Sequence, residues 1–112
     1  MTSASYVPDA GDIVWLQFSP QAGHEQAGHR PAVVLTPASY NRFRLMLCCP
    51  MTTKRKGYPF EVAIAGDRES VVLADQVKSL DWRARNAQRK GRVSDHELGE
   101  VRAKAAALIG KP

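Results

Sequence analysis

The segment from residue 23 to residue 31 combines side chains that can bind a phosphate and transfer protons. It contains, in chain order, Glu25, Gln26, His29 and Arg30. Pro31 fixes its own φ angle and biases Arg30 toward an extended conformation, so the guanidinium is held where an apolar stretch begins. General acid–base catalysis and the stabilisation of a developing charge need groups of these types. A polar hairpin loop with a surface arginine is the alternative interpretation.

A second polar segment places two hydroxyl groups beside a run of cations. Thr52 and Thr53 follow an apolar stretch and precede the basic residues 54–56. Hydroxyls donate hydrogen bonds to phosphate oxygens, while Lys and Arg neutralise phosphate charge. The pattern is typical of a phosphate-binding site, and a solvated basic turn has the same composition.

A third polar segment, residues 74–79, directly follows another apolar stretch and contains Gln76 and Lys78. These side chains can contact the base edges of a single-stranded nucleic acid. They can equally mark the end of a strand.

The composition favours a single domain with an anionic partner. The chain has 112 residues and a net charge of +5, which predicts one domain over residues 1–112. A basic balance of this size suits nucleic acid or a protein with an acidic tail, and equally a solvated basic face. The N-terminal residues lack the pattern of a signal peptide, and no apolar run approaches the ~20 residues of a membrane span. We therefore expect a cytoplasmic protein without membrane contact.

The two cysteines, Cys48 and Cys49, are adjacent in the sequence. Adjacent residues on a strand point to opposite faces, and a disulfide between neighbours would be strained. We predict that both are reduced and partly buried. With only two Cys and three scattered His, no zinc-binding spacing appears, so we expect chemistry without a tightly bound metal.

The elements that must position these residues are mainly β. Five short strands, separated by Gly, Pro, Asn or Asp, are predicted at residues 13–18, 31–35, 45–49, 60–64 and 71–74. Residues 31–35 are apolar throughout, which predicts a central strand. Phe60, Val62 and Ile64 alternate with Glu61 and Ala63, which predicts one buried face. So many short strands in a small domain favour a compact barrel or a curled sheet.

The C-terminal part of the chain changes to a helical period. Ser94 and Glu97 form a capping-box pattern that predicts a helix start. The predicted apolar stripe consists of Leu98, Val101, Ala105 and Leu108. Gly110 predicts the end of the helix. The preceding linker, residues 82–92, carries five basic residues and no acid, and Trp15 and Trp82 are predicted as core or interface residues.

Taken in order, these segments resemble the MazF/PemK family of toxins from bacterial toxin–antitoxin pairs. The matching blocks cover nearly the whole chain and lie at residues 6–12, 23–35, 56–62, 74–79 and 81–85. The glycine–glutamate–glutamine…arginine–proline loop is the most specific of them. The resemblance implies a small SH3-like β-barrel of the PemK/CcdB toxin type, with a C-terminal helix, that works as a homodimer.

The resemblance also implies an activity. Members of the family cleave single-stranded mRNA at specific sequences, without a ribosome and without a metal or other cofactor, and thereby arrest growth. The products would be a 2′,3′-cyclic phosphate and a 5′-OH end. The implied partners are single-stranded RNA and a cognate antitoxin whose acidic C-terminal segment occupies the RNA groove, with operator DNA bound only through the antitoxin.

The family's catalytic arginine and threonine match Arg30 and Thr52 in this sequence. Glu25 is our first candidate for the general base, with His29 second. The residues expected to bind RNA are Phe18, Gln26, His29, Thr53, Lys56, Gln76 and Lys78, together with the basic run at 83–92. Two alternatives stay open: a non-catalytic binding module like the gyrase-poisoning toxins that share the barrel, or a toxin domesticated as a regulator.

Overall fold

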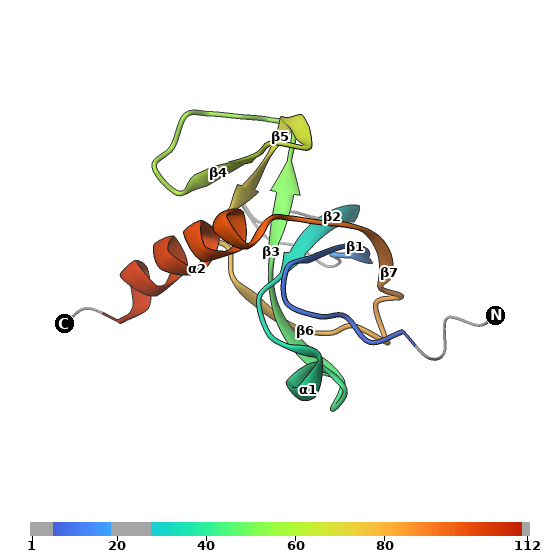
Figure 1. Cartoon of the computed structure of the whole chain (residues 1–112). Helices are drawn as coiled ribbons and strands as arrows, with labels where there is room; N and C mark the ends of the chain where they lie inside the picture. Colours follow the sequence, from blue (N-terminus) through green and yellow to red (C-terminus); the bar gives the residue numbers. More distant parts are fainter. Residues whose placement is uncertain (1–5, 19–27, 111–112) are drawn as a thin grey trace.

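The computed structural model of the chain describes residues 6–18 and 28–110, and these residues form one curled antiparallel sheet with two helices (Figure 1). The elements are β1 (Asp12–Gln17), β2 (His29–Val34), α1 (Ala38–Asn41), β3 (Leu45–Thr52), β4 (Glu61–Ile64), β5 (Asp67–Leu73), β6 (Lys78–Asp81), β7 (Gln88–Arg92) and α2 (Asp95–Ile109). The expected mainly β fold with a C-terminal helix is confirmed.

The central position of β2 and β3 in the sheet decides where the polar segments meet. The strand order is β4-β5-β3-β2-β1-β7, and β6 pairs with β3 off this path. The long strand β3 pairs with β6 through Leu45–Cys48 and with β5 through Met51 and Thr52. β3 therefore joins the two halves of the curled sheet, and its C-terminal end lies where β2 begins.

Adjacent residues of β3 supply both faces of the core, as the strand geometry predicts. Cys48 packs with Leu16 and Trp82 in one apolar cluster, and Cys49 packs with Val33 in the other. Both cysteines are fully buried, more completely than expected, because β3 is an interior strand with both faces covered. Burial raises the pKa of each thiol to about 12.

Helix α2 begins with the predicted capping box. The Ser94 hydroxyl accepts a hydrogen bond from the Glu97 N–H (3.1 Å), and Glu97 Oε1 accepts one from the Ser94 N–H (2.8 Å). Glu97 Oε2 also accepts a hydrogen bond from the Ala65 N–H (2.7 Å), which ties the helix start to the β4–β5 turn. These N–H donors, Ala65 first, lower the pKa of the Glu97 carboxyl.

The apolar stripe of α2 packs on the sheet only over its first part. Leu98, Val101 and Ala105 are buried as predicted, whereas Leu108 is 51% exposed. The C-terminal part of the helix extends beyond the sheet (Figure 1), so the prediction that Leu108 belongs to the buried stripe is wrong.

Three short elements were not predicted from the sequence: α1, β6 and β7. The sequence of β6 is KSLD and that of β7 is QRKGR, and neither has an apolar alternation. Both are strands because they hydrogen-bond to longer neighbours, β6 to β3 and β7 to β1. In the described part of the chain, no helix combines the length and the apolar character needed to cross a bilayer.

Candidate active site

The structure brings Arg30 and Thr52 together at the junction of β2 and β3. Ala32 lies opposite Pro50 and Val33 opposite Cys49 in this antiparallel pair. The same register, continued by two residues, places Arg30 opposite Thr52. Both line a pocket of about 350 Å³ that we call the arginine pocket, together with His29, Thr53, Trp15 and Lys90.

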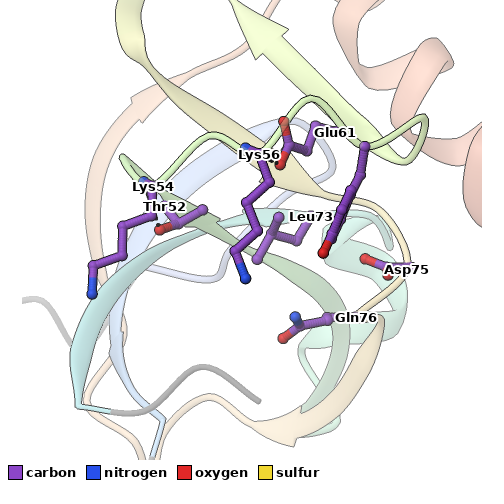
Figure 2. Close-up of a pocket in the computed structure, with 8 residues that line it drawn as sticks. Thr52, Lys54, Lys56, Glu61, Leu73, Asp75 and Gln76 are labelled. Atoms are coloured by element: carbon purple, nitrogen blue, oxygen red, sulfur yellow. Dashed lines mark hydrogen bonds between the residues drawn. The ribbon is translucent and has the colours of Figure 1, made fainter. Parts of the chain in front are cut away.

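A second pocket of about 320 Å³ adjoins the first at Thr52, and we call it the lysine pocket. Lys54, Lys56 and Gln76 also line it. Figure 2 shows Lys56 and Gln76 extending into the same space from the β3–β4 and β5–β6 connections. Because Thr52 lines both pockets, a single strand of an anionic polymer can pass from one to the other across its hydroxyl.

The Thr52 side chain is fixed at the point where the two pockets meet. Thr52 is only 5% exposed, and its Oγ1 accepts a hydrogen bond from the Lys54 N–H (3.1 Å). A hydroxyl has one donor hydrogen besides its acceptor lone pairs. The contact with Lys54 uses an acceptor position, so the hydroxyl hydrogen can be donated to a ligand.

The connection that carries Lys56 is held by Glu61. Its carboxylate accepts hydrogen bonds from the Lys56 N–H (2.9 Å) and the Gly57 N–H (3.0 Å). Gly57 has a φ of +76°, a value that strains any residue with a Cβ. The Lys56 ammonium lies 5.8 Å from the centroid of the Tyr58 ring. The backbone of this connection is therefore fixed, although its side chains are exposed.

Trp15 and Lys90 also line the arginine pocket. The sequence predicted Trp15 as a core or interface residue, and Lys90 only as one member of the basic run at 83–92. The ring of Trp15 is stacked with that of His29, with centroids 5.3 Å apart and an interplanar angle of 16°. The Lys90 ammonium lies 5.7 Å from the Trp15 ring centroid. The alternation of β1 gives a signal for Trp15, because its neighbours Val14 and Leu16 point to the apolar cluster that contains Cys48 and Trp15 points to the opposite face of the strand.

A β-bulge explains why Lys90 alone of the basic run reaches the pocket. Ile13 pairs with Gly91 and Val14 with Arg89, so Lys90 is the extra residue of β7. The bulge turns Arg89 and Arg92 to the same side. Each lies near the buried carboxylate of Asp12, at 3.7 Å from Arg89 and 3.5 Å from Arg92.

Most of the basic run makes other contacts outside the two pockets, and its binding of RNA stays a prediction. Besides the pair that contacts Asp12, Arg83 stacks on Trp82, and Arg85 donates to the Gln17 carbonyl (2.9 Å). Lys90 is the one residue of the run that lines either of the two pockets. The others hold β7 and the preceding turn against the rest of the fold.

Phe18 is a correction among the predicted RNA contacts. Its side chain is 2% exposed and packs in the apolar cluster that contains Leu16 and Trp82. Its ring therefore has no free face for a base. The expectation failed because Phe18 continues the inward-facing alternation of Val14 and Leu16 just beyond the end of β1.

Of three further predicted residues, one lines neither pocket and two are not among the residues that the structure describes. Lys78 is half-buried at the start of β6 and lines neither pocket. Glu25 and Gln26 lie outside the described residues. Within residues 6–18 and 28–110, no group of three or more His, Cys, Asp or Glu side chains could hold a metal ion.

Comparison with known proteins shows the family of the chain. The family model for the PemK-like, MazF-like toxin of type II toxin–antitoxin systems matches residues 9–109. The endoribonuclease toxin MazF of Escherichia coli K12 is 57% identical over 107 residues, which cover 94% of this chain and 96% of the relative. The endoribonuclease PemK of Escherichia coli is 32% identical and covers 90% of this chain and 81% of its own length.

Two solved structures extend the similarity to the fold. The crystal structure of MazF from Deinococcus radiodurans is 53% identical, covers 96% of this chain and 100% of its own, and superimposes with a TM-score of 0.90. A crystal structure of MazE-MazF from the same organism has the same identity and coverage and a TM-score of 0.84. The chain therefore belongs to the PemK-like, MazF-like toxins of type II toxin–antitoxin systems.

Proposed function

We propose that the protein is an endoribonuclease toxin that cuts single-stranded mRNA at the arginine pocket. The observation that carries the proposal is the meeting of Arg30 and Thr52 in that pocket. The Escherichia coli relative, which is 57% identical to this chain, is named an endoribonuclease, and this name supports the proposal. The cut is sequence-specific and independent of the ribosome, and it needs no cofactor.

The chemistry uses the hydroxyl of the RNA itself. The 2′ oxygen forms a bond to the adjacent phosphorus and loses its proton to a base. The bond from phosphorus to the 5′ oxygen breaks, and that oxygen gains a proton from a general acid or from water. The products are a 2′,3′-cyclic phosphate and a 5′-OH end. DNA lacks the attacking hydroxyl, so it is bound and not cut.

Arg30 and Thr52 act on the charge that builds up at phosphorus. An arginine stays protonated at any physiological pH, so Arg30 serves as a fixed cation rather than a proton donor. Its guanidinium stabilises the negative oxygens of the transition state. The Thr52 hydroxyl donates to a non-bridging oxygen. Glu25 is the first candidate to accept the proton from the 2′-OH, and His29 is the second.

The rest of the two pockets binds and orients the strand. Thr53, Lys56 and Gln76 contact the RNA on either side of Thr52, since they line the pockets that meet there. Gln26 and Lys78 contribute to the same groove.

The partners follow from the same basic surface. A cognate antitoxin with an acidic C-terminal segment competes with RNA for the groove, and operator DNA is bound only through that antitoxin. The structures of MazE-MazF from Deinococcus radiodurans support such a partner. The toxin works as a homodimer in the cytoplasm.

Incubation of the purified protein with a long single-stranded RNA in EDTA tests the proposal, with mapping of every cut end. Discrete cuts with 5′-OH ends are expected, and the Arg30→Ala variant should make them more slowly, by roughly a hundredfold or more. RNA that stays intact while the protein still binds it would contradict the proposal and favour the non-catalytic binding module. Cuts that disappear in EDTA and return with a metal would contradict the mechanism.

A further inference from the structure

The cluster of Trp15, His29 and Lys90 at the rim of the arginine pocket has features that packing alone does not require. Trp15 is half-buried, although both of its neighbours on β1, Val14 and Leu16, are fully buried. A large aromatic ring kept partly in water gives up part of the free energy that its burial would contribute. His29 and Lys90, which lie against it, are both exposed.

We propose that Trp15, His29 and Lys90 form a nucleotide subsite beside the cleaved phosphate. The inference rests on the proposed function, because it assigns this cluster to the RNA that Arg30 and Thr52 cut. One flanking base stacks on the exposed face of the His29 ring, whose other face lies on Trp15. The Lys90 ammonium binds the phosphate of the same nucleotide.

The geometry of the cluster suits the stacking of a nucleotide base better than an ion pair alone. The two rings are nearly parallel, with an interplanar angle of 16°, so a third flat ring can extend the stack. Bases stack on aromatic side chains in many single-strand binding proteins, and this contact tolerates any sequence. The two strands and the bulge fix the platform, since Trp15, His29 and Lys90 come from β1, β2 and β7.

The subsite also separates two roles of His29. A ring that stays stacked between Trp15 and a base binds substrate. The proposal therefore leaves the proton from the 2′-OH to Glu25. A His29→Phe variant, which keeps a flat ring, should retain more of the affinity for RNA than a variant without a ring. A His29→Ala variant should bind RNA more weakly.

The first test compares Lys90→Ala with Arg83→Ala, which is a matched control. Both residues are exposed cations lying over a tryptophan ring, at 5.7 Å for Lys90 and 5.1 Å for Arg83, and Arg83 lines neither pocket. The probe is an RNA oligonucleotide that spans a mapped cut site, made uncuttable by a 2′-deoxy sugar at the cleaved nucleotide. Lys90→Ala should lower the log–log salt slope of its binding by about 0.7, and Arg83→Ala should leave the slope unchanged.

The second test removes the base instead of the protein side chain. An abasic nucleotide next to the cut site should weaken binding to the unmodified protein by about tenfold. It should have little further effect on the His29→Ala variant, which has already lost the platform. Trp15 is tested with Trp15→Phe, which keeps a ring, because a Trp15→Ala variant can fail to fold.

The outcomes separate the subsite from the proposed function. If the protein cuts RNA and Lys90→Ala behaves like Arg83→Ala, the subsite is wrong and the endoribonuclease stands. If the abasic nucleotide lowers RNA affinity equally for the unmodified protein and for the His29→Ala variant, that result would also overturn the subsite. If Lys90→Ala weakens antitoxin binding and leaves RNA binding unchanged, the cluster belongs to the antitoxin interface. Intact RNA with the unmodified protein refutes the proposed function itself.

Discussion

Arg30 and Thr52 lie on neighbouring antiparallel strands, and the register of β2 and β3 places them across from each other at one end of the sheet. The permanent cation and the hydroxyl donor therefore point into one pocket from two elements of the central sheet. Both strands thus offer a phosphate-binding group to the same pocket.

Replacing Arg30 by alanine or by lysine tests whether its positive charge is what accelerates cleavage. Arg30→Ala should lower the cleavage rate by roughly a hundredfold or more, because it removes the cation from the transition state. Arg30→Lys should keep part of the rate, since it keeps a positive charge. Single-turnover cleavage of a long single-stranded RNA measures both variants. A rate for Arg30→Ala close to that of the unmodified protein would end the catalytic assignment.

Replacing Thr52 isolates its hydroxyl. Thr52→Val keeps the shape of this buried side chain and removes the donor, so we expect a loss in cleavage rate of roughly a hundredfold. Thr52→Ser keeps the hydroxyl and should retain most of the rate. Thermal unfolding of both variants serves as the control for folding. Equal rates for the valine and serine variants would mean that the hydroxyl takes no part.

Lys56 should contribute to RNA affinity through its charge alone. Lys56→Ala should lower the log–log salt slope of binding to single-stranded RNA by about 0.7, because one fewer counterion is released. Arg42→Ala is the matched control, since Arg42 is an exposed cation beside α1 that lines neither pocket. An unchanged slope for Lys56→Ala would remove this residue from the groove.

Glu97 should make stability depend on pH. Hydrogen bonds from Ala65 and Ser94 lower the pKa of its carboxyl below the ordinary 4.5. The unfolded chain then takes up this proton at a higher pH than the folded chain, so the contribution is present above about pH 4.5 and is lost as the pH falls through the folded value.

Denaturation of the Glu97→Gln variant checks this dependence. At pH 7 the variant should have a free energy of unfolding lower by about 1 kcal/mol. The difference from the unmodified protein should shrink as the pH falls below the ordinary value. Glu100→Gln is the control on the same helix, because Glu100 is exposed. A difference that stays constant from pH 7 to pH 3 would contradict the prediction.

The two thiols should be inert in the folded protein. Burial raises the pKa of Cys48 and Cys49 to about 12, so the reactive thiolate is nearly absent at pH 8. A thiol reagent should label neither cysteine in the native protein and both in denaturant. The ordinary pKa of 9.0 applies to the unfolded chain, so stability should fall above about pH 9. Fast native labelling would show that β3 opens locally.

Several parts of the structure follow from the sequence because neighbouring residues decide them. Helix α2 is one case, since the capping box of Ser94 and Glu97 and the buried positions Leu98 and Val101 depend only on spacing along the helix. The opposite directions of Cys48 and Cys49 follow equally from strand alternation. The residue types in the polar segments made Arg30 and Thr52 candidates, and the family resemblance gave them their predicted catalytic roles.

Other parts depend on contacts between distant segments, which only the tertiary structure decides. The register of β2 against β3 brings Arg30 to Thr52, and no local pattern fixes that register. The bulge in β7 sends Lys90 to the pocket and Arg89 to Asp12, although the sequence shows one undivided basic run. Strands with few apolar residues, β6 and β7, form because longer partners supply their hydrogen bonds. Local chemistry thus selects the residues, and pairing between distant strands decides which of them meet.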